Sequence, residues 1–230
     1  MWSYYGSKSK VVDYYPPPKQ SKIIEPFAGS ARYALKWFDR DVLLVDKFEM
    51  IVKIWNYLKQ ASEKDILGLP NMDNREVDRV NDYDICDEAK WIIGFSIGRG
   101  SSRPKNKPGK YNSWIDDKKR IAYNLFKIRH WEIRQGDFMD IENQEATWFI
   151  DPPYQFGGEH YKCSNKQIDF SLIAKWCKER EGQTIVCENT KADWLDFKPM
   201  VSMQGSTYKT TEAIWSNMPT NYDNVQQTLF

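Results

Sequence analysis

The tetrapeptide Asp151-Pro152-Pro153-Tyr154 carries groups that can bind an amino group on a planar ring. Proline has no backbone N–H, so the two prolines fix the chain and leave their carbonyl oxygens as acceptors. Asp151 adds a carboxylate acceptor, and Tyr154 adds an aromatic face. The apolar residues 147–150, directly before the tetrapeptide, are typical of a buried strand. Because ligands of a doubly wound sheet bind beyond the carboxyl ends of its strands, we expect these residues to line an active-site crevice.

The same groups suit the transfer of a methyl group to an amine on an aromatic ring. The lone pair of such an amine is delocalised into the ring, so the nitrogen is a poor nucleophile. A carboxylate and a carbonyl that accept both N–H groups favour a localised lone pair and stabilise the positive charge that develops on nitrogen. A tyrosine ring could hold a base that has left its helix. The alternative interpretation is an ordinary strand-to-turn connection, since prolines often follow strands.

Acidic residues at the ends of other apolar segments predict a nucleoside pocket. Residues 25–31 (Glu-Pro-Phe-Ala-Gly-Ser-Ala) form a turn of mostly small residues, where the backbone can approach a cofactor. Asp46 ends a second apolar run and is placed to accept hydrogen bonds from ribose hydroxyls. Asp137 ends a third strand-like segment and could hold an adenine amino group beside Phe138. Each acid alone is more typical of a helix N-cap or a turn, but the three together favour the pocket.

The hydrophobic periodicity predicts the elements that position these residues. Residues 22–30 are predicted to form a short buried strand that runs into a tight turn. The other predicted strands cover residues 41–46, 131–134, 147–150, 184–187, 200–203 and 212–215. The predicted helices between them cover residues 31–38, 48–60 and 170–180. This alternation is typical of a parallel sheet covered on both faces. We therefore predict an α/β, doubly wound (Rossmann-like) catalytic domain, formed by residues 1–60 and 129–230.

Residues 61–128 interrupt the alternation and form a predicted insertion. They are mostly helical in character to about residue 98 and resume as an amphipathic helix over residues 116–127. The segment 98–113 between these helices is rich in glycine, proline and basic residues, which is typical of a loop. The insertion therefore combines helices with a basic loop.

Composition indicates a globular protein without metal chemistry. The chain is 41% hydrophobic, which is enough for a core, and its formal net charge is only +1. The four cysteines form no Cys-x-x-Cys pair and there are two histidines, so a zinc site is not expected. The apolar runs are too short to span a bilayer, and the N-terminus lacks the features of a signal peptide. We expect a soluble, cytoplasmic protein with reduced thiols, no metal and no membrane association.

On these motifs the chain resembles the Dam-like DNA adenine methyltransferases, in particular the small methylases of phages and prophages. Members of this class carry a DPPY catalytic motif and an F-x-G-x-G cofactor motif. The matching segments follow one another as Tyr4-Tyr5-Gly6-Ser7-Lys8, residues 25–31, Asp46, Asp137-Phe138 and residues 151–154. Two departures are Ala31, where the motif usually has its second glycine, and Tyr4-Tyr5, where Trp-Ala is more usual.

The resemblance implies a class I methyltransferase sheet that binds S-adenosylmethionine. Asp46 would bind the ribose and Asp137 the adenine, while Tyr5, Gly6 and Lys8 would contact the methionine end and the DNA side. The expected cofactor-binding residues are Tyr5, Gly6, Lys8, Glu25, Pro26, Phe27, Ala28, Gly29, Asp46, Lys47, Asp137 and Phe138. The expected catalytic residues, which would hold the target base, are Asp151, Pro152, Pro153 and Tyr154.

The resemblance also implies double-stranded DNA as the partner, with the insertion as the target-recognition region. Residues 99–120 contain eight basic and two acidic residues, although such a run is more commonly a solvated loop. Basic side chains can neutralise phosphates, and asparagine or arginine can reach base edges. The expected DNA-binding residues are Arg99, Arg103, Lys105, Lys107, Lys110 and Asn112.

The residues leave other substrates and partners open. Related enzymes for cytosine N4 more often carry serine at the position of Asp151, and glutamine methylases carry asparagine. Aspartate therefore favours adenine N6 without excluding RNA, while an inactive DNA-binding relative would lack the acid or the cofactor turn. The loop 155–162 contains two adjacent glycines and could close over a flipped base, and His160 within it is as well explained as a surface residue. A restriction endonuclease partner and a monomer or weak dimer fit the same pattern.

Overall fold

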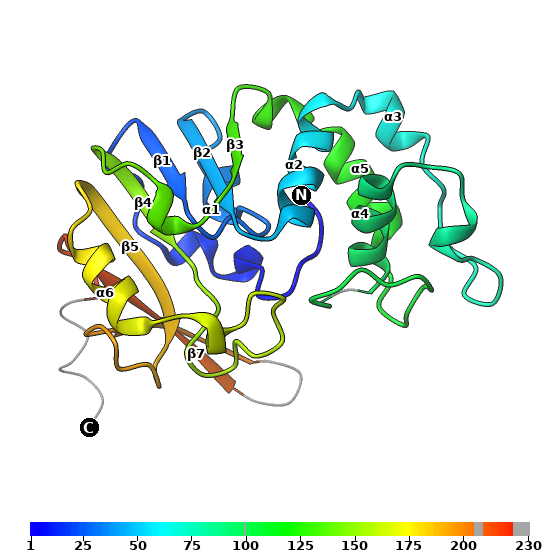
Figure 1. Ribbon diagram of the computed structural model, residues 1–230. Coiled ribbons are helices and arrows are strands. Elements are labelled where there is room, and N and C mark those ends of the chain that lie inside the picture. The colour runs from blue at the N-terminus through cyan, green and yellow to red at the C-terminus, as the bar shows by residue number, and fades with distance from the viewer. Residues whose placement is uncertain (99, 205–208, 223–230) are drawn as a thin grey trace.

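A seven-stranded sheet forms the centre of the molecule. The computed structural model describes residues 1–98, 100–204 and 209–222, and in these the strand order is β3-β2-β1-β4-β5-β7-β6 (Figure 1). The strands are β1 (Lys22–Glu25), β2 (Asp41–Asp46), β3 (Glu132–Gln135), β4 (Ala146–Ile150), β5 (Gly182–Asn189), β6 (Lys198–Gln204) and β7 (Lys209–Ser216). The strands from β3 to β5 in this order are parallel, and β7 is antiparallel to both β5 and β6. This is the predicted doubly wound, Rossmann-like sheet.

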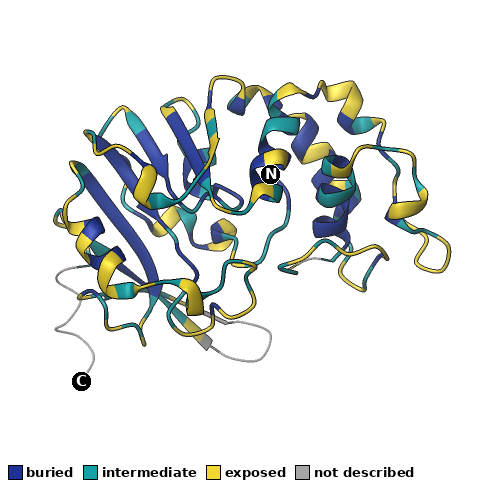
Figure 2. Cartoon of the chain, in the orientation of Figure 1, coloured by how far each residue is buried: buried dark blue, intermediate teal, exposed yellow. Residues whose placement is uncertain are grey.

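Helices cover both faces of this sheet. Neighbouring residues of β1 enter different apolar cores, Ile23 on one face and Ile24 on the other. The helices α1 (Arg32–Lys36) and α2 (Glu49–Gln60) pack on the first face, and α6 (Phe170–Lys178) packs on the second. Every residue of β4 is buried, so the centre of the sheet is dark blue in Figure 2. Parallel strands that are buried on both faces read as continuous apolar runs, which is why they were predictable.

The insertion contains less helix than predicted. Its helices are α3 (Glu63–Leu67), α4 (Asp87–Ile97) and α5 (Trp114–Ala122). The prediction of mostly helical structure is wrong for residues 68–86, where the described helical structure is a 3-10 turn at Val80–Asp82. Gly68 ends α3, and Pro70 disfavours a helical residue before it, so the chain leaves the helix there. The predicted helix 116–127 begins two residues earlier and ends at Ala122, before a 3-10 turn at Leu125–Ile128.

The insertion shares the core of the first face of the sheet. Ile92 and Phe95 of α4 and Trp114 of α5 are fully buried in the same apolar cluster as Trp55 of α2. In Figure 1, α3, α4 and α5 lie beyond α2 and β3, at one end of the sheet. The insertion therefore extends the core of the sheet and packs against it.

The described residues show three further features. No helix among them is long and apolar enough to cross a membrane. No three histidine, cysteine, aspartate or glutamate side chains in this part of the chain lie together as a bound metal ion would require. Cys86, Cys163, Cys177 and Cys187 are free thiols.

Candidate active site

A cavity of about 320 Å³ lies at the carboxyl ends of β1, β2 and β4. Its wall contains every residue that was predicted to bind the cofactor: Tyr5, Gly6, Lys8, Glu25, Pro26, Phe27, Ala28, Gly29, Asp46, Lys47, Asp137 and Phe138. Asp151 and Pro153 of the catalytic motif line the same cavity, whereas Pro152 is buried and Tyr154 lines a neighbouring groove. The fold thus brings five separate segments of the sequence to one site.

The turn from β1 to α1 has a left-handed backbone. Gly29 has a φ of 45°, and Ala31 has a φ of 43° and a ψ of 52°. The backbone N–H of Ala28 donates to the carbonyl oxygen of Val45 at 3.0 Å, which places the turn beside the end of β2. Glycine adopts left-handed values without strain, so the structure explains why related motifs have glycine at the position of Ala31.

Asp46 ends β2 and fixes this turn. Its Oδ2 accepts the backbone N–H of Gly29 at 2.9 Å, and its Oδ1 accepts that of Phe48 at 2.8 Å. Burial raises the pKa of Asp46 to about 6, although both backbone donors lower it, so the carboxylate is ionised at neutral pH. A carboxylate offers about four lone pairs, so Asp46 can accept further donors in the cavity.

Asp137 lies after β3 and caps a 3-10 turn at Phe138–Asp140. Its Oδ2 is 2.9 Å from Nζ of Lys47, and its Oδ1 accepts the backbone N–H of Met139 at 3.2 Å. Partial burial raises the pKa of Asp137, but these donors outweigh it and lower the pKa overall. The rings of Phe27 and Phe138 lie 5.5 Å apart beside this carboxylate, so the cavity has an apolar wall suited to a planar ring.

Glu25 supports α1 from within the site. It is 2% exposed, and its Oε1 accepts the backbone N–H of Ala34 at 2.6 Å. That N–H belongs to the first turn of α1 and has no acceptor within the helix. Burial raises the pKa of Glu25 to about 8, so its side chain is protonated at neutral pH. Glu25 thus lines the cavity as a neutral group that holds the helix.

The catalytic motif is paired with the N-terminal motif. Nζ of Lys8 lies 2.8 Å from Oδ1 of Asp151, 3.6 Å from Oε1 of Glu212 and 4.5 Å from the centre of the Tyr154 ring. Burial raises the pKa of Asp151 to about 6, and Lys8 lowers it. Burial also lowers the pKa of Lys8, but the two carboxylates raise it overall. Lys8 therefore stays charged beside an ionised Asp151 at neutral pH.

Glu212 on β7 belongs to this cluster, although the sequence interpretation gave it no role. Its Oε1 accepts hydrogen bonds from the hydroxyl of Tyr15, at 2.6 Å, and from the hydroxyl of Tyr154. The strand register places Glu212 opposite Asn189 of β5, which is not predictable from sequence periodicity. The one signal was an acid directly before the apolar residues 213–215 of a predicted closing strand.

The loop after the catalytic motif folds back over the N-terminal motif. Glu188 at the end of β5 is fully buried, and its Oε1 accepts the backbone N–H of Gln155 at 2.5 Å, which fixes the start of this loop. The ring of Tyr161 lies 5.1 Å from that of Tyr5, and its hydroxyl donates to the Tyr5 carbonyl oxygen at 3.4 Å. A methyl group added at Gly6 would lie 1.8 Å from this hydroxyl, so glycine there makes room for Tyr161. His160 is exposed.

A groove of about 810 Å³ lies next to the cavity. Its walls come from the N-terminal segment, the insertion and the β6–β7 hairpin, and its charged lining residues are Lys8, Lys10, Arg32, Arg120 and Glu212. The cavity and the groove share the segment 4–8, together with Arg32 and Tyr161. Asp151 on the cavity side and Tyr154 on the groove side therefore mark the junction of the two hollows.

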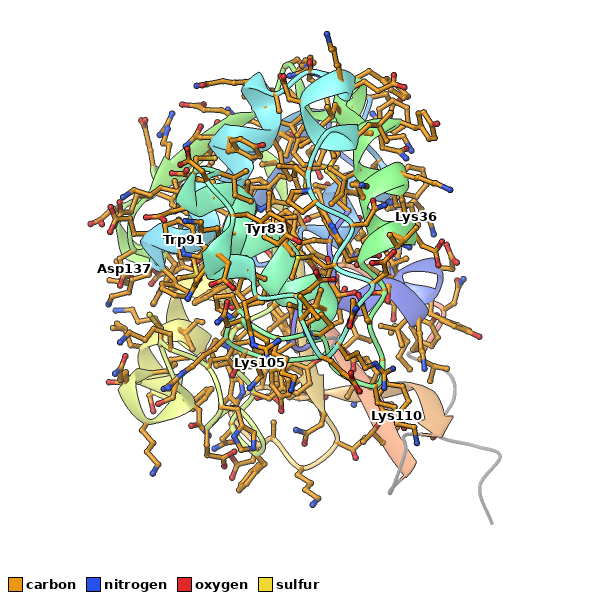
Figure 3. The ribbon with its side chains drawn as sticks, turned by 90° about the vertical axis from the view of Figure 1, so that its right-hand side faces the viewer. Lys36, Tyr83, Trp91, Lys105, Lys110 and Asp137 are labelled. Carbon is orange, nitrogen blue, oxygen red and sulfur yellow. The ribbon has the colours of Figure 1, made fainter. Side chains whose placement is uncertain are left out.

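The predicted DNA-binding residues lie on the loop between α4 and α5. Arg103, Lys105, Lys107 and Lys110 are exposed there, and Arg99 lies outside the described residues. Figure 3 views the molecule from the side of the insertion, and Lys105 and Lys110 lie along the lower edge of the insertion. Gly100 of the same loop lines the groove, whereas these four basic side chains do not.

Asn112 forms hydrogen bonds within the insertion. Its Nδ2 donates to the carbonyl oxygen of Met72 at 2.6 Å, and its Oδ1 accepts the backbone N–H of Trp114 at 2.9 Å. Its amide therefore holds two segments of the insertion together, and its contact with DNA stays a prediction. The sequence could not show this because Met72 is distant from Asn112 along the chain.

Comparisons with known proteins bear on the fold. No protein-family model matches the sequence, and no curated protein sequence matches it with significance. Among solved structures, the "putative methylase HI0767" from Haemophilus influenzae is 12% identical, with a TM-score of 0.38 over 87% of this chain and 81% of that chain. The "putative methyltransferase yhhF" from Escherichia coli is 8% identical, with a TM-score of 0.34 over 90% of this chain and 78% of that chain. Likenesses at this level leave the chemistry to be argued from the site.

Proposed function

We propose that this protein is a site-specific methyltransferase that transfers the methyl group of S-adenosylmethionine to N6 of a flipped-out adenine in double-stranded DNA. The observation that carries the proposal is the position of Asp151, at the junction of the cavity and the neighbouring groove. A methyl donor in the cavity and an amine entering from the groove would meet beside this carboxylate.

The cavity suits S-adenosylmethionine in size and in its groups. About 320 Å³ falls within the range of small-molecule sites, which typically hold mostly apolar walls and a few placed polar groups. Asp46 would accept hydrogen bonds from the ribose hydroxyls, and Phe27 and Phe138 would pack against the adenine ring, with Asp137 beside them. When bound, S-adenosylmethionine supplies a methyl group on a positively charged sulfur.

The residues around Asp151 would hold the acceptor amine. Among the described residues Lys8 bonds Oδ1 of Asp151, which leaves Oδ2 to accept one N–H of the amine. The carbonyl of Pro152 would accept the other, and Tyr154 would contact the base. Together the two acceptors localise the lone pair and stabilise the positive charge that forms on nitrogen. The proton lost from the methylated nitrogen passes to water.

The groove and the basic loop support a nucleic-acid substrate. A duplex carries a phosphate charge about every 1.7 Å along its axis, so a confined basic surface can bind it although the net charge of the protein is +1. Lys10 in the groove, and the exposed Arg103, Lys105, Lys107 and Lys110 on the loop that reaches the groove at Gly100, would contact phosphates. The insertion would thereby supply the target-recognition region.

Nucleoside mass spectrometry tests the proposal. Unmethylated DNA is incubated with S-adenosylmethionine and the wild-type protein, or with Asp151→Ala. We expect N6-methyladenine with the wild type only, because Asp151→Ala removes the acceptor of the amine. N4-methylcytosine would change the target base, while no modified nucleoside in a protein that binds S-adenosylmethionine would refute DNA as the substrate.

Calorimetry separates the cofactor site from the acceptor site. Asp46→Ala should weaken S-adenosylmethionine binding by about 10- to 100-fold, because hydrogen bonds to a charged group contribute about 1.5–3 kcal/mol. Asp151→Ala should leave that affinity nearly unchanged. Asp41→Ala, at the exposed opposite end of β2, is the matched control. Loss of affinity in Asp151→Ala with retention in Asp46→Ala would show that the two sites are assigned the wrong way round.

A further inference from the structure

Glu212 is the point at which three separate segments of the active site meet. Its Oε1 accepts hydrogen bonds from the hydroxyls of Tyr15 and Tyr154, and it lies 3.6 Å from Nζ of Lys8. Tyr15 precedes β1, Lys8 lies in the N-terminal motif and Tyr154 ends the catalytic motif. The side chain of Glu212 is 15% exposed, so little water competes for these donors.

The charges of this cluster do not cancel. Lys8 is one cation, and Asp151 and Glu212 are two carboxylates at 2.8 Å and 3.6 Å from its Nζ. Since Lys8 and Asp151 form the closer pair and balance each other, Glu212 supplies the excess negative charge. Methyl transfer to an amine moves positive charge onto nitrogen, and a fixed negative charge nearby stabilises it.

We propose that Glu212 is a positioning residue for methyl transfer, which fixes Lys8 and Tyr154 around Asp151 and gives the buried cluster one net negative charge. The inference rests on the proposed function, in which Asp151 accepts a hydrogen bond from the target amine. Glu212 acts through Lys8 and Tyr154, and it is not assigned a contact with the base or the cofactor. β7 thereby contributes to the site as well as to the sheet.

The electrostatic effect on Asp151 distinguishes this role from simple support. The ionisable groups around Asp151 are Lys8, Tyr15, Glu25, Tyr154, Tyr161, Cys187, Glu188 and Glu212. Burial raises the pKa of Asp151 most, Lys8 lowers it, and the charge of Glu212 raises it further. Removing that charge should lower the pKa of Asp151. The acid limb of the pH–rate profile, where protonation of Asp151 stops the reaction, should therefore move to lower pH. A residue that only supported the fold would not shift this limb.

The test compares Glu212→Gln with wild type. Glutamine keeps the shape and the acceptor oxygen of Glu212 and removes its charge. Glu132→Gln on β3, at the other side of the sheet, is the matched control with the same charge change. Carboxyl ¹³C NMR of protein labelled at aspartate gives the titration midpoint of Asp151, identified by the signal lost in Asp151→Asn. Methyl-transfer kinetics on DNA give kcat, the KM for S-adenosylmethionine and the acid limb.

We expect the Asp151 midpoint and the acid limb to move to lower pH in Glu212→Gln and to stay in place in Glu132→Gln. The kcat of Glu212→Gln should fall about 10- to 100-fold with the KM for S-adenosylmethionine unchanged, because misplacement of the acceptor affects the transfer step. If the wild type is active and the titration midpoint of Asp151 is the same in Glu212→Gln, the role of Glu212 is overturned and the proposed function is not. A displaced midpoint with no methyl transfer by the wild type overturns the proposed function and leaves Glu212 coupled to Asp151.

Tyr15→Phe keeps the inference testable if Glu212→Gln does not fold. This variant removes one donor to Glu212 and none of the charges. It should lower kcat about three- to tenfold, as expected for one lost hydrogen bond, with the Asp151 midpoint unchanged. An unchanged kcat in Tyr15→Phe overturns the positioning role.

Discussion

At the residue scale, the left-handed turn between β1 and α1 lines the proposed cofactor site. Gly29 and Ala31 both adopt positive φ there, and Asp46 bonds the turn from β2. Alanine in this conformation carries about 1–2 kcal/mol of strain, so the chain retains a costly residue where glycine would be relaxed. Ala31 is 2% exposed, and its methyl group lies in the apolar core. Burial of that methyl group offsets the strain.

We predict that Ala31→Gly leaves the free energy of unfolding within about 0.5 kcal/mol of wild type. Loss of a buried methyl group costs about 0.8 kcal/mol, and the added freedom of the unfolded chain costs about 0.4–1 kcal/mol, while the strain is released. Ala28→Gly, in the same turn at 4% exposure and without a positive φ, is the control and should lose about 1.5 kcal/mol. Urea denaturation measures both. Equal losses in the two variants would contradict the strain at residue 31.

The residues of the site differ in how far the sequence could predict them. Asp46, Asp137 and Asp151 each lie at or after the end of a predicted strand, and parallel strands bring such ends to one edge, so their convergence was predictable. Glu212 and Tyr15 meet through the register of the antiparallel strand β7, which no local pattern specifies. The site residues that the sequence could not predict are therefore those held by contacts between distant parts of the chain.

At the element scale, the same distinction separates the sheet from the insertion. The apolar runs and the helical spacing predicted strands β1, β2 and β4 and helix α2 to within a few residues. The boundaries in residues 61–128 were less predictable, because turns such as 68–86 are fixed by packing against α4 and α5 and by single bonds such as Asn112 to Met72. The basic loop was recognisable from composition, which specifies charge and not contacts.

The basic loop gives a prediction on DNA affinity. Lys105→Gln with Lys107→Gln should weaken DNA binding and reduce the salt dependence, with a loss of about one unit of slope in log K against log[salt] for each phosphate contact removed. S-adenosylmethionine affinity should not change, because neither residue lines the cavity. Fluorescence anisotropy over a range of salt concentrations measures the slope. The matched control is Lys175→Gln with Lys178→Gln on α6, whose exposed side chains belong to the opposite face of the sheet. An equal loss of slope in both pairs would show that the loop has no special part in binding.

At the scale of the whole molecule, one apolar core joins the sheet to the insertion. The cluster that contains Ile23 of β1 and Trp55 of α2 continues through Ile92 and Phe95 of α4 to Trp114 of α5. Cutting this core between α2 and α4 would expose fully buried side chains on both parts. A segment that cannot bury its apolar surface alone is not expected to fold alone.

We therefore predict that the insertion and the sheet unfold in a single transition and that a ligand of the sheet stabilises both. S-adenosylmethionine at about 100 times its Kd should add about 2.7 kcal/mol to the free energy of unfolding, which corresponds to a rise in Tm of roughly 5–11 °C for a chain of this size. Scanning calorimetry should show one peak that moves as a whole, and hydrogen exchange should slow in α4 and α5 as well as at the strand ends. Asp46→Ala is the control, since it should reduce the shift without dividing the transition. Two calorimetric peaks, with the ligand moving only one of them, would show that the insertion is an independent folding unit. The position of the insertion beside the groove would then depend on bound DNA.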